Sequence, residues 1–267
     1  NAGIVDNTFY LWTHNSAPIV HTGPYVLDFT TDDYATYNTS IATGTAATSG
    51  GSIPSRYIAS GQSFLIRGAS VGNATFNNAM RVKTNNDAFF RTSNVVANKN
   101  TTSQRDLLWL NLTNEYGAFN QILVGFVEGA TNTVDEYDSK KRLSPSVSFY
   151  SVIEGDGYTI NGRQALEGDQ EIPLGFMSKI SGSFNYSIEI DHTEGDFEDY
   201  DIYLEDKELN VLHDLRLGKY DVVIDQGEFN ERFALVLMKK ENIEELTVTD
   251  DSVVIYQNSN DLEIISS

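Results

Sequence analysis

The strongest constraint on this chain is an alternation of apolar and polar residues within residues 174–238. One run has the apolar residues Phe184, Tyr186, Ile188 and Ile190 separated by Ser183, Asn185, Ser187 and Glu189. Successive side chains of a strand point to opposite faces, so this run predicts a half-buried strand. The pattern returns at residues 220–224, breaks at Gly227 and closes at residues 233–237. Short strands separated by turn residues predict an antiparallel sandwich.

The apolar positions of this stretch predict a shared core. Its expected members are Phe184, Tyr186, Ile188, Ile190, Val222, Ile224, Phe233 and Leu235. Each lies on the apolar side of its run, and two such runs packed face to face would bury all of them.

Strands are also expected in the first part of the chain, which is rich in Thr, Ser, Asn and Gly. The expected strands are residues 9–13, 63–67, 73–76, 107–112 and 121–127. One face should hold Leu108, Leu110 and Leu112, and another Ile122, Val124 and Phe126. Residues 114–117 read as the hairpin turn between the last two strands. Residues 43–55 read as a small-residue loop outside the core, and residues 135–143 as one or two helical turns.

Charge is distributed unevenly along the 267 residues, whose net charge is −20. Residues 1–150 carry 10 Lys and Arg against 11 Asp and Glu, net −1, and residues 151–267 carry 8 against 27, net −19. The change predicts a domain boundary near residue 150. Nucleic acid is excluded as a partner, because an acidic surface repels phosphate.

The predicted fold class is therefore all-β, with two tandem antiparallel β-sandwich domains of the jelly-roll or Ig-like kind. The first domain is residues 1–148, with upstream strands expected to complete it, and the second is the acidic sandwich of residues 149–238. Residues 239–267 form a linker and two strand-like runs, 246–256 and 262–265. No run approaches the length of a membrane span, so the chain is not expected to cross a membrane.

Sequence motifs give no catalytic constellation, so no catalytic residue is predicted. There is no Cys, which excludes disulfides and thiolate metal sites. The four histidines have no metal-ligand spacing, and they read as structural or surface residues: His14, His21, His192 and His213. A Gly-x-Ser-x-Gly nucleophile elbow and a phosphate-binding glycine loop are both missing. A glycosidase would need two carboxyls at a defined separation, which sequence cannot supply.

The only metal candidate is an acidic stretch between two expected strands. Its carboxylates are Asp191, Glu194, Asp196, Asp199 and Asp201. Several oxygen donors around Gly195 suit calcium, but the spacing differs from that of an EF-hand. A solvated acidic loop that keeps a sheet end from associating is the preferred interpretation. Apart from this candidate calcium, no cofactor is predicted.

Aromatic residues raise a further alternative, a stacking platform for a sugar. The residues concerned are Trp12, Trp109, Tyr10, Tyr25, Tyr34 and Tyr37. Both tryptophans lie in apolar strand runs, so core packing is the preferred interpretation for them.

A series of short motifs resembles one family over nearly the whole chain. The motifs are FYLWTH (9–14), YIASGQSF (57–64), FNNAMR (76–81), LWLNLT (108–113), GFVEGAT (125–131), YDSKK (137–141), INGR (160–163), IPLGF (172–176), YLED (203–206) and GEFNERF (227–233). Their order and spacing resemble the C-terminal region of large secreted and cell-surface proteins of Bacteroidota, many of them adhesin-like, that are exported by the type IX secretion system.

This resemblance implies a non-enzymatic C-terminal module that presents an upstream effector or adhesin. Localisation would be secreted, extracellular or on the outer cell surface. The alternatives are a glycan- or surface-polymer-binding module and an accessory domain of a secreted hydrolase. The implied partners are the upstream domains of the same protein, the type IX translocon and a PorV-type shuttle barrel.

The resemblance also makes the C-terminal tail similar to the beginning of a type A sorting domain of the type IX system. Such a domain opens with a Tyr-Pro-Asn-Pro-like corner, and here the corresponding residues 256–259 read YQNS, without proline. The alternative is that the two runs of the tail join the second sandwich as ordinary edge strands.

Overall fold

The computed structural model describes residues 3–17, 19–20, 27–28, 30–83, 90, 105–142, 146–240, 254–258 and 261–265. Strands dominate this part of the chain, so the predicted all-β class is confirmed. The helical elements described here are single 3-10 turns, η1 Thr31–Asp33, η2 Asn78–Met80 and η3 Phe197–Asp199. None of the described helices has the length and apolar character needed to cross a membrane.

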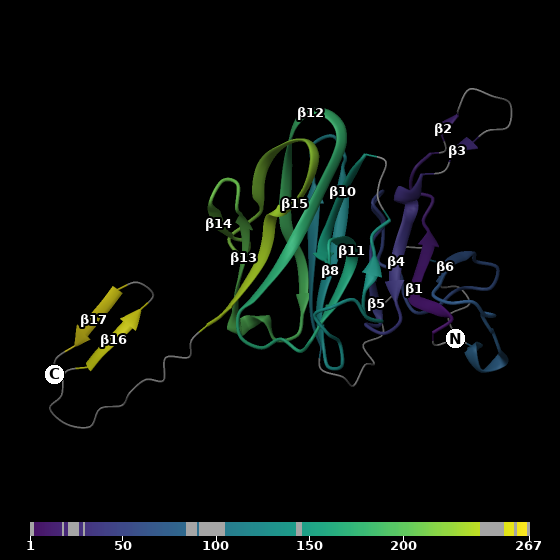
Figure 1. The fold of residues 1–267 in the computed structure, drawn as a ribbon, viewed down its shortest axis with the longest axis horizontal. Helices are drawn as coiled ribbons and strands as arrows, with labels where there is room; N and C mark the ends of the chain where they lie inside the picture. The colour runs from purple at the N-terminus through teal and green to yellow at the C-terminus, as the bar shows by residue number, and fades with distance from the viewer. Residues whose placement is uncertain are drawn as a thin grey trace.

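The N-terminal part of the chain contains a four-stranded antiparallel sheet, in the strand order β5-β4-β1-β6 (Figure 1). Its strands are β1 Val5–Trp12, β4 Tyr34–Asn38, β5 Thr43–Thr45 and β6 Phe64–Gly68. A separate short ladder joins β2 Ile19–Val20 to β3 Leu27–Asp28. We call the four-stranded sheet the small sheet.

A nine-stranded sheet, the large sheet, follows in the order β10-β11-β8-β7-β12-β15-β13-β14, with β9 beside β11. Its strands are β7 Arg105–Thr113, β8 Phe119–Val127, β9 Ser139–Lys140, β10 Val147–Ile153, β11 Asp156–Arg163, β12 Gln170–Glu194, β13 Tyr200–Asp206, β14 Val211–Asp214 and β15 Tyr220–Lys239. Because β10 pairs with both β11 and β12, the sheet curls back on itself and forms two layers.

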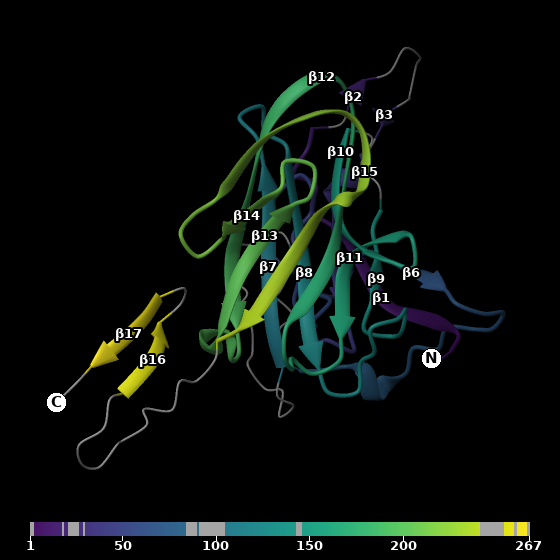
Figure 2. The same cartoon turned by 60° about the vertical axis from the view of Figure 1, so that its left-hand side comes forward.

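The long strands β12 and β15 belong to both layers. Residues 170–178 of β12 pair with residues 227–237 of β15, and residues 174–178 also pair with β10, whereas residues 187–194 pair with β7. The register shifts between Ser178 and Ser183, where Gly182 has a positive φ of 107° that suits glycine. In Figure 2, β13 and β15 pass in front of β7 and β8. Each of the two long strands therefore bends and continues from one layer into the other, without a loop between the layers.

The main core lies between these two layers, and the predicted core is confirmed. Six of its eight predicted members are buried, and Phe184 and Ile190 pack against the same cluster while partly exposed. Leu108, Leu110 and Leu112 share one buried face of β7, as predicted, and alternate residues of β8 do the same. The opposite face of β7 is buried too, because Trp109 packs in a second cluster with Ile41, which lies in the turn between β4 and β5 of the small sheet.

The predicted boundary between residues 148 and 149 is wrong. It falls inside β10, and strands from both sides of it share the large sheet and the main core. The small sheet packs on the outer face of β7 and β8, so the small sheet and the large sheet share a second core and form one packed unit. The prediction was wrong because the distribution of charge along the chain reflects the solvent-facing side chains and does not indicate which strands pair.

Several local predictions are confirmed. The expected strands at residues 9–13, 63–67, 107–112 and 121–127 correspond to β1, β6, β7 and β8, and residues 114–117 make the turn between β7 and β8.

Three local predictions fail. Residues 73–76 form no strand. The segment 43–55 contains β5, and Ala47 is fully buried because its small side chain fits against the small sheet. Residues 135–142 form a turn and β9 in place of a helix, since Asp135 and Asp138 bond to backbone amides there; residue 143 lies outside the described part.

The C-terminal runs form a hairpin, in which β16 Val254–Asn258 pairs with β17 Asp261–Ile265. Among the described residues these two strands form a sheet of their own, so they are not edge strands of the large sheet. Residues 241–253 of the predicted tail lie outside the described part of the chain.

Candidate functional site

Residues 135–142, which we call the strap, include β9 at the edge of the large sheet and also contact the small sheet. The Asp138 carboxylate accepts the backbone N–H of Gly162 at 2.9 Å and that of Asp135 at 2.8 Å. From the small sheet, the Asn38 amide donates to the backbone oxygens of Glu136 and Asp138, both at 3.1 Å. The strap is therefore fixed from both sides, which gives its side chains defined positions.

A groove of about 340 Å³ opens where the strap meets the edge of the small sheet. The lining comes from β1, β6 and the strap: Tyr10, Leu65, Ile66, Arg67, Lys140, Lys141 and Arg142. Four of these seven residues are cationic on a chain whose net charge is −20. Cations collected at one concave place in an acidic protein attract anions by a local field.

The cations of the groove are held in different ways. The Arg142 guanidinium lies over two rings, 5.3 Å from the centroid of Tyr10 and 5.1 Å from that of Tyr34. Lys140 pairs with Asp156 at 2.8 Å, and Arg67 is exposed on β6. Arg142 is thus oriented by cation–π contacts, and its N–H groups suit a carboxylate, sulfate or phosphate.

Tyr10 contacts both Arg142 and the backbone of the strap. Its ring is 6% exposed, and its hydroxyl donates to the backbone oxygen of Lys140 at 3.3 Å. Burial raises the pKa of Tyr10 to about 12, so the hydroxyl stays protonated and keeps donating. Tyr10 is therefore a support for Arg142 and the strap, and too deeply buried to stack on a sugar.

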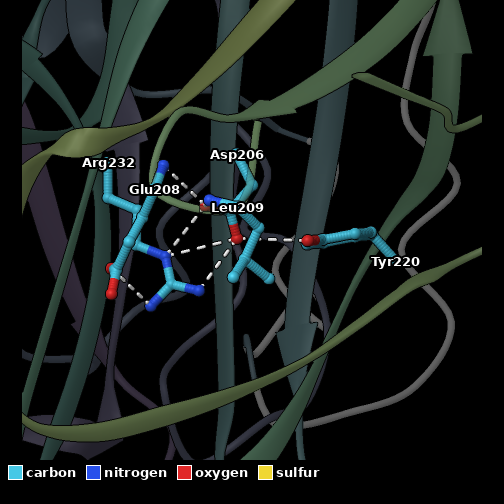
Figure 3. A network of polar contacts seen from close by, with 5 residues as sticks. All are labelled: Asp206, Glu208, Leu209, Tyr220 and Arg232. Atoms are coloured by element: carbon cyan, nitrogen blue, oxygen red, sulfur yellow. Dashed lines mark hydrogen bonds and ion pairs between the residues drawn. The ribbon is translucent and has the colours of Figure 1, made fainter. Parts of the chain in front are cut away.

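A second polar cluster joins β13 to β15 at the end of the sheet (Figure 3). The guanidinium of Arg232 donates to both carboxylate oxygens of Asp206, at 2.9 to 3.2 Å, and Asp206 is fully buried. The same carboxylate accepts the Tyr220 hydroxyl at 3.1 Å and the backbone N–H groups of Glu208 and Leu209.

Burial alone would raise the pKa of Asp206, but the hydrogen bonds from Arg232 and the backbone lower it below its ordinary value. The guanidinium side chain is 8% exposed, so Arg232 and Asp206 face each other in the interior. Both carboxylate oxygens of Asp206 accept hydrogen bonds from groups of the chain itself. The cluster therefore fixes the β13–β14 turn and does not present a binding site.

The predicted calcium ligands do not come together. These residues are Asp191, Glu194, Asp196, Asp199 and Asp201, and within the described residues no group of three or more such side chains could hold a metal ion. Asp191 and Glu194 belong to β12, not to a loop. Asp191 accepts a hydrogen bond from Asn111 at 2.9 Å, and Glu194 faces Arg105 at 3.6 Å.

The histidines and tryptophans have mainly packing contacts. His192 stacks on Trp109 with ring centroids 4.0 Å apart, and the Trp109 indole donates to the Gly44 oxygen at 2.9 Å. Core packing is therefore confirmed for Trp109. Trp12 is half-buried and meets Tyr34 edge to face. His21 and Tyr25 lie outside the described residues.

Sequence reasoning did not select the groove. The cation run 140–142 was visible in the sequence, but its partners on β1 and β6 lie more than seventy residues earlier. Only the pairing of β6 with β1, and the packing of the strap on both sheets, brings them together.

Comparison with known proteins gives one finding. Residues 1–237 match the family model of a domain of unknown function, DUF8693. No curated protein and no solved structure matches the chain.

Proposed function

The chain belongs to the DUF8693 family, and we propose that it is a non-enzymatic module of a secreted or cell-surface protein that binds anionic polysaccharide through the groove. The observation that carries this proposal is the cationic lining formed by Arg67, Lys140 and Arg142 on an acidic chain. Among the described residues that line the groove there is neither a carboxylate nor a histidine. The lining thus offers charge recognition without an evident general base.

The chemistry of these groups favours a repeating anion over a single small one. An exposed ion pair contributes at most about 1 kcal/mol, so one carboxylate in an open groove binds weakly. A polymer presents many such groups, and each further contact benefits from the effective concentration set by the first. The ligand proposed is therefore a carboxylated or sulfated polysaccharide.

Binding of polygalacturonate, of a sulfated polysaccharide and of neutral dextran to the full chain tests the proposal. We expect both acidic polymers to bind and dextran not to bind, with affinity that falls as salt is added. Arg142→Glu should weaken binding about tenfold or more, a loss of about 1.4 kcal/mol. Lys179→Glu makes the same charge change at an exposed position outside the groove and should bind like the parent. Equal losses in both variants would refute a role for the groove.

The export context is part of the same proposal. The motifs that resemble type IX substrates, and the paired runs of the tail, support export by that system, with the translocon and a PorV-type shuttle barrel as partners of the tail. A reporter fused to the C-terminal part of the protein from residue 241 onward should appear outside the native host. It should stay in the periplasm when the shuttle is deleted. Export that persists without the tail would show that the tail is not the export signal.

A further inference from the structure

The ammonium of Lys141, one of the groove-lining residues, points toward Asn120. The lysine follows β9 and the asparagine lies near the start of β8, so the contact joins two parts of the chain 21 residues apart. The Nζ atom donates to Oδ1 of Asn120 at 2.8 Å. Asn120 is fully buried, so the end of the lysine side chain reaches into the interior.

The Asn120 amide is held in one orientation. Its Nδ2 donates to the backbone oxygen of Val147 at 3.3 Å, and its Oδ1 accepts the backbone N–H of Phe149 at 3.3 Å. The carbonyl oxygen thus receives two donors, Lys141 and Phe149. Once Lys141 attacks the carbon it no longer donates to this oxygen, so the Phe149 N–H is the donor that stabilises the negative charge developing there.

Burial of Lys141 makes its amine a better nucleophile, because it favours the neutral form. Burial lowers the pKa of Lys141 to about 8, and the charge of Asp32 opposes that shift in part. At a pH near 8 about half of the amines are neutral, and a neutral amine carries the free electron pair that attack requires. Asp32 also lines a cavity of about 290 Å³ together with Asn120, and its charge acts on Lys141.

From this geometry we propose that Lys141 and Asn120 join in an intramolecular isopeptide bond. The lone pair of Nζ attacks Cγ of Asn120, and Oδ1 takes the negative charge of the tetrahedral intermediate. A proton passes from Nζ to Nδ2, with the Asp32 carboxylate as its carrier. The bond from Cγ to Nδ2 then breaks and ammonia leaves, so that an amide between Nζ and Cγ remains. The reaction consumes no oxidant, reductant or other co-reactant.

This bond would tie the strap to β8 covalently. The strap carries two of the cations of the groove, Lys140 and Arg142, and it contacts both sheets. A covalent link at Lys141 would keep those cations in place even when the hydrogen bonds of the strap open. The inference stands apart from the proposed ligand, because the bond would form whether or not the groove binds a polymer.

The intact mass of the full chain tests the proposal. We expect a mass lower than that of the sequence by one ammonia, and a protease digest with one branched peptide that joins residues 120 and 141. Mass can be measured on denatured protein, so the result does not depend on how well a variant folds. A parent chain with the full sequence mass and two separate peptides would overturn the proposal.

Variants separate the parts of the mechanism. Asn120→Ala and Lys141→Met should each keep the full mass expected for their sequences and unfold at a lower temperature than the parent. Lys140→Met is the matched control, since Lys140 is the neighbouring cation and pairs with Asp156; it should still lose one ammonia. Asp32→Asn should slow or abolish the loss while Lys141 and Asn120 remain. Loss of ammonia in Asn120→Ala would place the reaction elsewhere and refute the assignment.

Discussion

Replacement of Arg232 by methionine should destabilise the fold strongly. Methionine keeps an unbranched apolar side chain at this position, although it is shorter than arginine and lacks the cation–π contact with Phe233, whose ring centroid lies 4.8 Å from the guanidinium. The main loss is the partner of the Asp206 carboxylate. That carboxylate is fully buried and keeps only the Tyr220 hydroxyl and two backbone N–H groups.

The magnitude follows from this geometry. Removing one member of a buried ion pair costs about 3–5 kcal/mol, because the remaining charge stays desolvated. For a folded body of this size, about 2–4 °C of melting temperature correspond to 1 kcal/mol. We therefore expect a decrease of about 6–20 °C. Lys207→Met is the control, because Lys207 pairs with Glu171 while its side chain is 43% exposed, and it should cost less than about 1 kcal/mol.

Urea unfolding and a thermal melt of the parent, Arg232→Met and Lys207→Met measure these values. Asp206 has a lowered pKa in the parent, so its contribution is present above the unfolded value near 3.8 and disappears as pH falls through the lower folded value. In Arg232→Met the unpaired carboxylate gains a proton more readily, so the two proteins should converge in acid. A melting temperature of Arg232→Met within about 1 °C of the parent would refute the reasoning.

Three further outcomes are expected. Ile188→Asp should cost about 3 kcal/mol or more in urea unfolding, because it buries an unpaired charge, whereas Ile188→Val should cost about 1 kcal/mol; equal values would show that the face is misassigned. Gly195→Ala should lower the free energy of unfolding by about 1–3 kcal/mol, because φ at Gly195 is +97° and a Cβ would lie 2.3 Å from Asp106 Oδ1. Gly61→Ala is the control: φ there is +82° but the space is open, so it should lower the free energy by about 1 kcal/mol. Burial raises the pKa of Asp138 to about 7, so the parent should lose about 2–3 kcal/mol relative to Asp138→Asn as pH rises from about 5 to about 8; parallel stability curves would contradict that shift.

Period-two patterning predicted the elements that bury one face against the main core. Tyr186 and Ile188 were assigned correctly because their polar neighbours face away from it. The apolar run of β7 predicted core packing for Trp109, but it did not predict that the face with Leu107 and Trp109 packs against a second sheet. A run buried on both sides requires a further layer, and the small sheet supplies it.

The division into two domains could not be predicted from charge, because charge describes the outer surface of a sheet and not its order of strands. The parallel pairing of β8 with β11, and the bends of β12 and β15, connect residues far apart in the chain. The candidate sites depend on the same long-range pairings. Arg67 and Arg142 are 75 positions apart, and neither has a local motif that indicates the other.

The double pairing of β15 has a mechanical consequence. Residues 233–237 of β15 are hydrogen-bonded to β12 on one side and to β13 on the other. Ladder bonds lie across the strand direction, so a tensile load applied at Lys239 along the strand would shear many of them together. Unzipping, which breaks bonds one at a time, would require a load across the strand. A pulling force applied through residues that follow Lys239 would therefore load the ladders of β15 in shear.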